Sequence, residues 1–77
     1  MPWTFTVKYE VKDFDPEAMT IYVIFKPSNL GIEDKVETPA TISLEGRTAE
    51  QACADYIPTA KIALLANLPA EYQGLYE

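Results

Sequence analysis

The sequence predicts a small α+β domain, in which a three-stranded antiparallel sheet is followed by a C-terminal helix in the order β-β-β-α. Three runs rich in β-branched and aromatic residues predict the strands, and a later run with apolar residues three and four apart predicts the helix. At 77 residues the chain can form one core, but a small domain buries a smaller fraction of its surface than a larger one. We therefore expect a single domain over residues 1–77, with a short tail from about residue 69, that gains stability by association.

The first predicted strand covers residues 3–12, where apolar and polar side chains alternate without interruption. This period of two places every odd residue on one face. The apolar face consists of Trp3, Phe5, Val7, Tyr9 and Val11. Asp and Pro residues in segment 13–18 then predict a reversal of the chain.

The second predicted strand, residues 20–26, contains hardly any polar side chain. Such a composition is typical of a strand that is covered on both faces. Ile21, Val23 and Phe25 should share one face, and Tyr22 and Ile24 the other. If the helix covers one face, the other must meet solvent, the tail of the chain or another molecule.

A polar connection over residues 27–35 carries two apolar residues, Leu30 and Ile32, and leads to the third predicted strand at residues 36–44. Pro39 cannot donate a hydrogen bond to a neighbouring strand. We therefore expect this strand to lie at an edge of the sheet or to begin after the proline, and to end at Gly46.

Thr48 and Gln51 form a capping-box pattern that predicts a helix from Ala49 to about Asn67. Small and apolar residues recur at helical spacing on the side expected to face the sheet. These residues are Ala49, Ala52, Cys53, Tyr56, Ala60, Ala63 and Leu64. Pro58 lies inside this run, so we expect a kink near Tyr56 or a break into two short helices.

The sequence predicts no catalytic residues, no metal ligands and no cofactor, and therefore a protein that is not an enzyme. It contains no histidine, and Ser28, Ser43 and Cys53 have no general base that the sequence suggests. Asp13, Asp15 and Glu17 have the spacing of a calcium loop. However, Ala18 and Ile24 stand where such a loop requires glycine and glutamate.

The net charge of −6 disfavours binding to nucleic acid or to an anionic membrane surface. Partners should therefore be proteins, as a homo-oligomer or as part of a larger assembly. Apolar and aromatic residues outside the expected core are the candidates for contact. They are Tyr22, Ile24, Leu30, Ile32, Tyr72, Leu75 and Tyr76. No signal peptide is recognisable, so export by that route is not expected.

One resemblance covers most of the chain. Residues 11–25, with Asp15 and the run Met19-Thr20-Ile21-Tyr22-Val23, precede a third strand and residues 46–60 with Tyr56-Ile57-Pro58. This pattern resembles small virion or tail-accessory proteins of tailed bacteriophages. The resemblance implies a non-enzymatic protein that acts by packing into a viral assembly, found in the virion or the host cytoplasm.

Two local resemblances concern the segment around Gly46-Arg47-Thr48-Ala49-Glu50-Gln51. It is similar to the strand-to-helix junction of HicB-type antitoxins, which implies a small acidic inhibitor of a basic RNA-cleaving enzyme. It is also similar to the junction of 4-oxalocrotonate tautomerases, which implies that Arg47 binds substrate and that a proline amine is the base. Pro2 could supply that amine only after removal of Met1.

Overall fold

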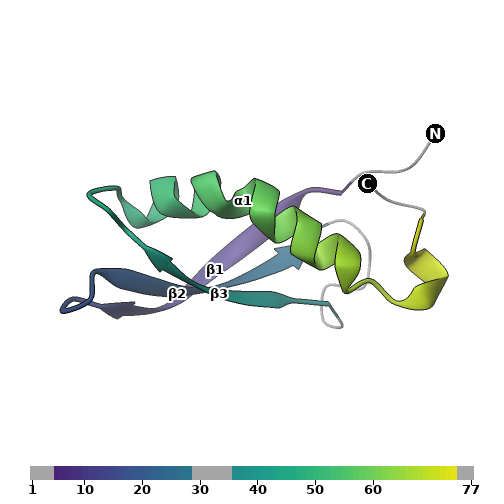
Figure 1. Cartoon of the computed structure of the whole chain (residues 1–77), viewed down its shortest axis with the longest axis horizontal. Helices are drawn as coiled ribbons and strands as arrows, with labels where there is room; N and C mark the ends of the chain where they lie inside the picture. Colours follow the sequence, from purple (N-terminus) through teal and green to yellow (C-terminus); the bar gives the residue numbers. More distant parts are fainter. Residues whose placement is uncertain (1–4, 29–35, 75–77) are drawn as a thin grey trace.

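The computed structural model describes residues 5–28 and 36–74 and confirms the predicted class and element order (Figure 1). The elements are β1 (Val7–Asp15), β2 (Thr20–Pro27), β3 (Thr38–Ser43), helix α1 (Ala49–Ala66) and the short 3-10 helix η1 (Ala70–Tyr72). The strands form one antiparallel sheet in the order β1-β2-β3. Helix α1 lies across one face of this sheet (Figure 1).

Strand β1 continues beyond the predicted end at Lys12, so the turn predicted over residues 13–18 is wrong at its start. Asp13 pairs with Tyr22 and Asp15 with Thr20, and the chain reverses over residues 16–19. The turn begins at Asp15, because its carboxylate accepts hydrogen bonds from the backbone N–H groups of Glu17 and Ala18, at 3.0 and 3.2 Å. Trp3, at the predicted start of the strand, lies outside the described residues.

A β-bulge at Lys12 changes the direction of the side chains that follow it. Val11 pairs with Val23 and Asp13 with Tyr22, so Lys12 is the extra residue. Phe14 consequently pairs with Ile21 and lies on the same side of the sheet as that buried residue. Without the bulge, strict alternation would have placed Phe14 on the opposite face.

Strand β3 lies at an edge of the sheet, as Pro39 predicted. The backbone N–H of Leu44 donates to the carbonyl oxygen of Met19 at 2.9 Å, which fixes the alternation of hydrogen bonds between β2 and β3. In this alternation Pro39, which pairs with Ile24, directs its nitrogen away from β2. The missing N–H therefore leaves no gap in the ladder.

Helix α1 begins with the predicted capping box. The Thr48 hydroxyl accepts from the Gln51 backbone N–H at 3.1 Å, and the Gln51 side chain accepts from the Thr48 backbone N–H at 3.0 Å. The helix then continues without interruption through Pro58 to Ala66, so the alternative of two short helices is wrong. Pro58 has no backbone N–H, so the carbonyl of Ala54 receives no helical hydrogen bond from it. Both residues are exposed, and water can therefore donate to that carbonyl.

The core lies between α1 and the covered face of the sheet. Tyr56 of α1 stacks on Phe25 with ring centroids 5.2 Å apart, and Tyr9 approaches Phe25 from β1 at 6.2 Å. Most residues expected on the sheet-facing side of the helix are buried or pack on this core. The buried apolar residues are Phe5, Ile21, Val23, Phe25, Val36, Ile42, Leu44, Ala52, Cys53, Ala60, Leu64 and Leu68.

Candidate interaction surface

The face of the sheet opposite α1 carries the most prominent contact candidate predicted from the sequence. Because Ile21, Val23 and Phe25 are buried beneath the helix, Tyr22, Ile24 and Lys26 project to the other side. Tyr22 is 42% exposed, and Ile24 is half-buried. We call this surface the open face. It consists of Lys8, Glu10, Tyr22, Ile24, Lys26, Pro39 and Thr41.

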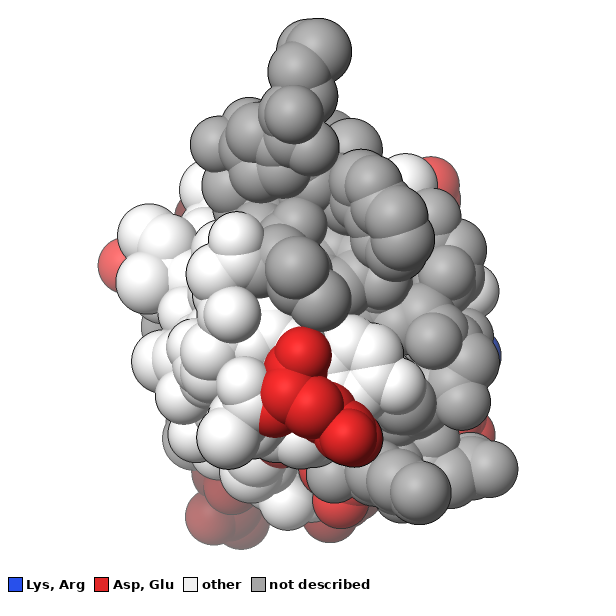
Figure 2. Space-filling view, turned by 90° about the vertical axis from the view of Figure 1, so that its right-hand side faces the viewer, with Lys and Arg blue, Asp and Glu red and all other residues white. Residues whose placement is uncertain are grey.

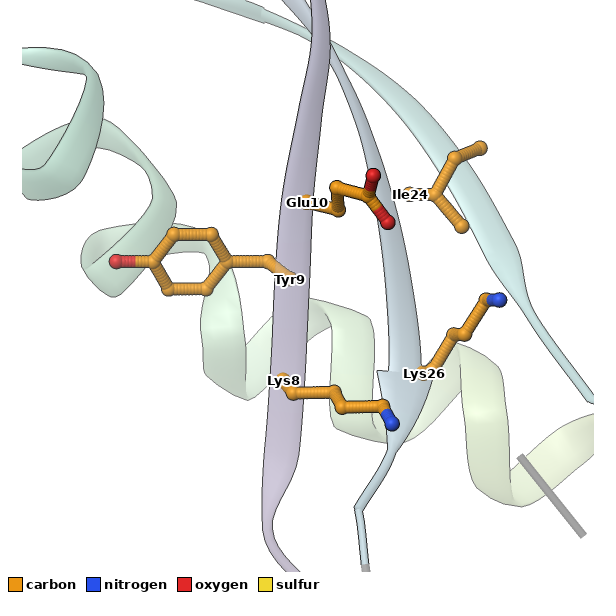
Figure 3. Close-up of a pocket in the computed structure, with 5 residues that line it drawn as sticks. All are labelled: Lys8, Tyr9, Glu10, Ile24 and Lys26. Carbon is orange, nitrogen blue, oxygen red and sulfur yellow. The ribbon is translucent and has the colours of Figure 1, made fainter.

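A shallow pocket of about 240 Å³ lies on the β1–β2 half of the open face. Figure 3 shows Lys8 and Glu10 directed over β2, toward Lys26 and Ile24, while the Tyr9 ring points to the opposite side of β1. Pockets that hold small organic ligands usually enclose roughly 300–1,000 Å³ and are mostly apolar. This hollow is smaller, and three of its five lining residues are charged, so it fits part of a protein contact better than a small-molecule site.

Charged side chains of both signs border the apolar part of the open face. Lys12 pairs with Glu10 at 2.8 Å, and Lys26 lies 3.9 Å from Glu37. The hydrogen bond from Lys12 and its charge hold the pKa of Glu10 below its usual range, and Lys26 and Lys8 act in the same direction. The open face thus combines an aromatic and aliphatic centre with a polar rim, the arrangement of many protein interfaces.

Of the other predicted contact residues, Tyr72 is the one that the structure describes. Tyr72, in η1, is half-buried and packs against the domain's own core. Leu30, Ile32, Leu75 and Tyr76 lie outside the described residues. Tyr22 and Ile24 are therefore the two predicted contact residues that the structure places together.

Sequence reasoning missed a second group of exposed apolar side chains, at the β1–β2 hairpin. Val11, Phe14 and Met19 are 42, 48 and 50% exposed. The sequence contained a signal for this group. Apolar residues occur at every second position as far as Val11, and the next one, Phe14, follows after three positions. That step is typical of a bulge.

Cys53 and Ser28, two candidates for chemistry in the sequence, are both engaged in the fold. Cys53 is fully buried, and burial raises the pKa of its thiol, which disfavours the reactive thiolate. The Ser28 hydroxyl forms a hydrogen bond with that of Thr6. Among the described residues no group of His, Cys, Asp or Glu side chains gathers as metal ligands would.

Arg47 joins the end of β3 to helix α1. Its Nε donates to the Leu44 carbonyl at 3.0 Å and one terminal nitrogen to the Ser43 carbonyl at 2.8 Å. The other terminal nitrogen binds the Asp55 carboxylate at 2.8 Å. All three guanidinium nitrogens thus bind the chain's own groups, and these bonds hold the guanidinium between the end of β3 and α1.

Figure 2 shows the end of the molecule at which η1 lies. The described atoms there are mostly uncharged, with several acidic side chains and only a trace of a basic one at the margin (Figure 2). This distribution agrees with the net charge of −6, and the described residues form no basic surface for phosphate groups at this end.

No protein-family model matches the chain, and no curated protein or solved structure is significantly similar to it. None of the described helices has both the length and the apolar character needed to cross a membrane. The functional interpretation therefore depends on the residues themselves.

Proposed function

We propose that the chain is a non-enzymatic structural or accessory protein that acts by protein–protein assembly, as in the particle of a tailed bacteriophage. The observation that supports this proposal is the open face, where exposed Tyr22 and half-buried Ile24 lie side by side on the middle strand of the sheet. Aromatic residues surrounded by a polar rim are enriched at protein interfaces. The viral setting is carried by the sequence pattern of residues 11–25 and 46–60.

Gradient sedimentation of extracts from the cells that produce the protein tests this proposal. The chain of 8.6 kDa should travel with a much heavier particle, and Tyr22→Ser or Ile24→Ser should move it to the light fractions. Ile62→Ser is the matched control. Ile62 is a large apolar residue, 70% exposed on α1, and its replacement should leave the sedimentation unchanged.

Sedimentation of the unaltered chain in the light fractions would contradict an assembly role. A heavy complex that survives both open-face substitutions would show that the contact lies elsewhere on the molecule. Folding of each variant is checked by urea unfolding, because both side chains also pack on the sheet.

A second candidate is an acidic inhibitor that binds a basic enzyme. It is favoured by the net charge and by the exposed carboxylates of Asp13, Asp15 and Glu17 at the hairpin. In this case the heavy fraction should contain one basic enzyme in equal amount. Asp13→Asn together with Glu17→Gln should then weaken that complex more than Tyr22→Ser does.

A further inference from the structure

Strand β1 presents an open edge of the sheet. Within the described residues it pairs on one side, with β2, whereas β2 is flanked on both sides. The other edge, β3, is shorter and carries Pro39, which limits pairing with a further strand. β1 has nine residues and contains no proline. An added strand would therefore meet the fewest obstacles at β1.

The hydrogen-bond alternation shows which backbone groups of β1 point outward. The Ser28 N–H donates to the Thr6 carbonyl at 2.9 Å, so Thr6 faces β2. In an antiparallel ladder the residues whose N–H and C=O groups bond to the partner strand alternate with residues whose groups point away from it. The backbone groups of Lys8 and Glu10 therefore face β2 as well. Val7, Tyr9 and Val11 then direct their N–H and C=O groups toward the open edge. Pro27, opposite Val7, agrees with this assignment because it has no N–H to donate.

We infer that the open edge of β1 pairs antiparallel with β1 of a second copy of this chain, in a register centred on Tyr9. This inference rests on the proposed assembly function and names its first partner. In this register Tyr9 lies opposite Tyr9 of the second copy, and Val7 lies opposite Val11. All outward N–H and C=O groups of these residues then find partners.

Charge complementarity selects this register. Two identical antiparallel strands are related by a two-fold axis, which passes through Tyr9 in this register. Lys8 of each copy then lies opposite Glu10 of the other, on the open face, and two ion pairs form. An axis at Lys8 or at Glu10 would place like charges directly opposite each other. An axis at Val7 leaves Lys8 opposite Thr6, and an axis at Val11 brings the Lys12 bulge into the paired segment.

The two helices do not obstruct this pairing. α1 contacts all three strands and therefore lies over the middle strand, β2. In the joined sheet the two β2 strands are three strand spacings apart, roughly 14 Å. Packed helices need about 8–10 Å between their axes. The remaining space lies above β1, where the Tyr9 rings are half-buried in the single chain.

Disulfide formation between two variants of the chain, each with one introduced cysteine on β1, tests this register. Lys8→Cys and Glu10→Cys chains are purified separately, mixed and oxidised. The mixture should give several-fold more disulfide-linked dimer, at twice 8.6 kDa, than either variant alone. In the mixed pair the two cysteines face each other, while the other Glu10 and Lys8 keep their ion pair. The unaltered chain is the control, because its Cys53 is fully buried and should not cross-link.

Each other outcome overturns the inference. Dimer from Lys8→Cys alone would place the axis at Lys8, and dimer from Glu10→Cys alone would place it at Glu10. No dimer in any sample would show that β1 does not pair with itself. If the chain still sediments with a large particle in that case, the proposed assembly function stands without self-pairing.

Discussion

At the residue scale, Cys53 and Arg47 are the two side chains that the sequence offers for a reaction or for ligand binding, and in the structure both contribute to the fold. Cys53 could be assigned from the sequence, because it falls among alanines on the apolar side of a predicted helix, and the structure buries it completely. The role of Arg47 could not be assigned. Its three hydrogen-bond partners come from Ser43, Leu44 and Asp55, and their convergence depends on the angle between β3 and α1. Local sequence does not fix that angle.

Burial of Cys53 predicts a loss of stability at alkaline pH. Because the pKa of the thiol is raised in the folded chain, the unfolded chain loses this proton first, near the ordinary pKa of a cysteine thiol. The free energy of unfolding should fall as pH rises above that value, by at most about 1.4 kcal/mol per pH unit for one proton. The measurement is urea unfolding from about pH 7 to pH 10.

Cys53→Ala is the control for this measurement, since it removes the thiol and retains every other ionisable group of the chain. The unaltered chain should lose more stability than Cys53→Ala over the same interval. Equal losses in the two proteins would mean that the thiol ionises as readily in the folded chain as in the unfolded one.

At the element scale, the existence and order of the strands and of α1 could be predicted, because periodicity and capping are local properties. The limits of β1 could not be predicted as well. The alternation in the sequence ends at Lys12, and Asp13 and Asp15 have turn chemistry, yet both of these aspartates pair with β2. Strand pairing across the hairpin prevailed over local preference, and the bulge placed Phe14 beside Ile21.

Pro58 is the clearest conflict between local preference and observed structure. The helix continues because α1 packs on the sheet on both sides of the proline, through Cys53 and Ala60. Pro58→Ala should restore a hydrogen bond to the Ala54 carbonyl and stabilise the fold by about 1–3 kcal/mol. For a domain of this size the melting temperature should rise by roughly 4–8 °C per kcal/mol.

Thermal unfolding followed by circular dichroism measures this effect. Thr59→Ala, at the neighbouring exposed position, is the matched control and should give a much smaller rise, since it changes helix propensity alone. A lower melting temperature for Pro58→Ala would mean that the proline contributes to packing in a way that outweighs the lost hydrogen bond.

At the scale of the whole molecule, one helix covers one face of a three-stranded sheet, and this leaves both the open face and the β1 edge accessible among the described residues. The sequence predicted that one face of the second strand is not covered by the helix, and that Tyr22 and Ile24 on this face contact a partner. It could not predict the self-complementary register of β1. That property depends on which backbone groups point outward and on the position of the bulge, which only the pairing with β2 defines.

The central claim, that this chain assembles with further copies of itself, is tested most directly by its molar mass in solution, measured by light scattering from micromolar to near-millimolar concentration. The mass should rise from 8.6 kDa toward at least twice that value. Lys8→Glu should weaken the dimer about tenfold by placing like charges opposite each other, and the exchange Lys8→Glu with Glu10→Lys should restore it. A mass of 8.6 kDa for the unaltered chain at every concentration would contradict the claim.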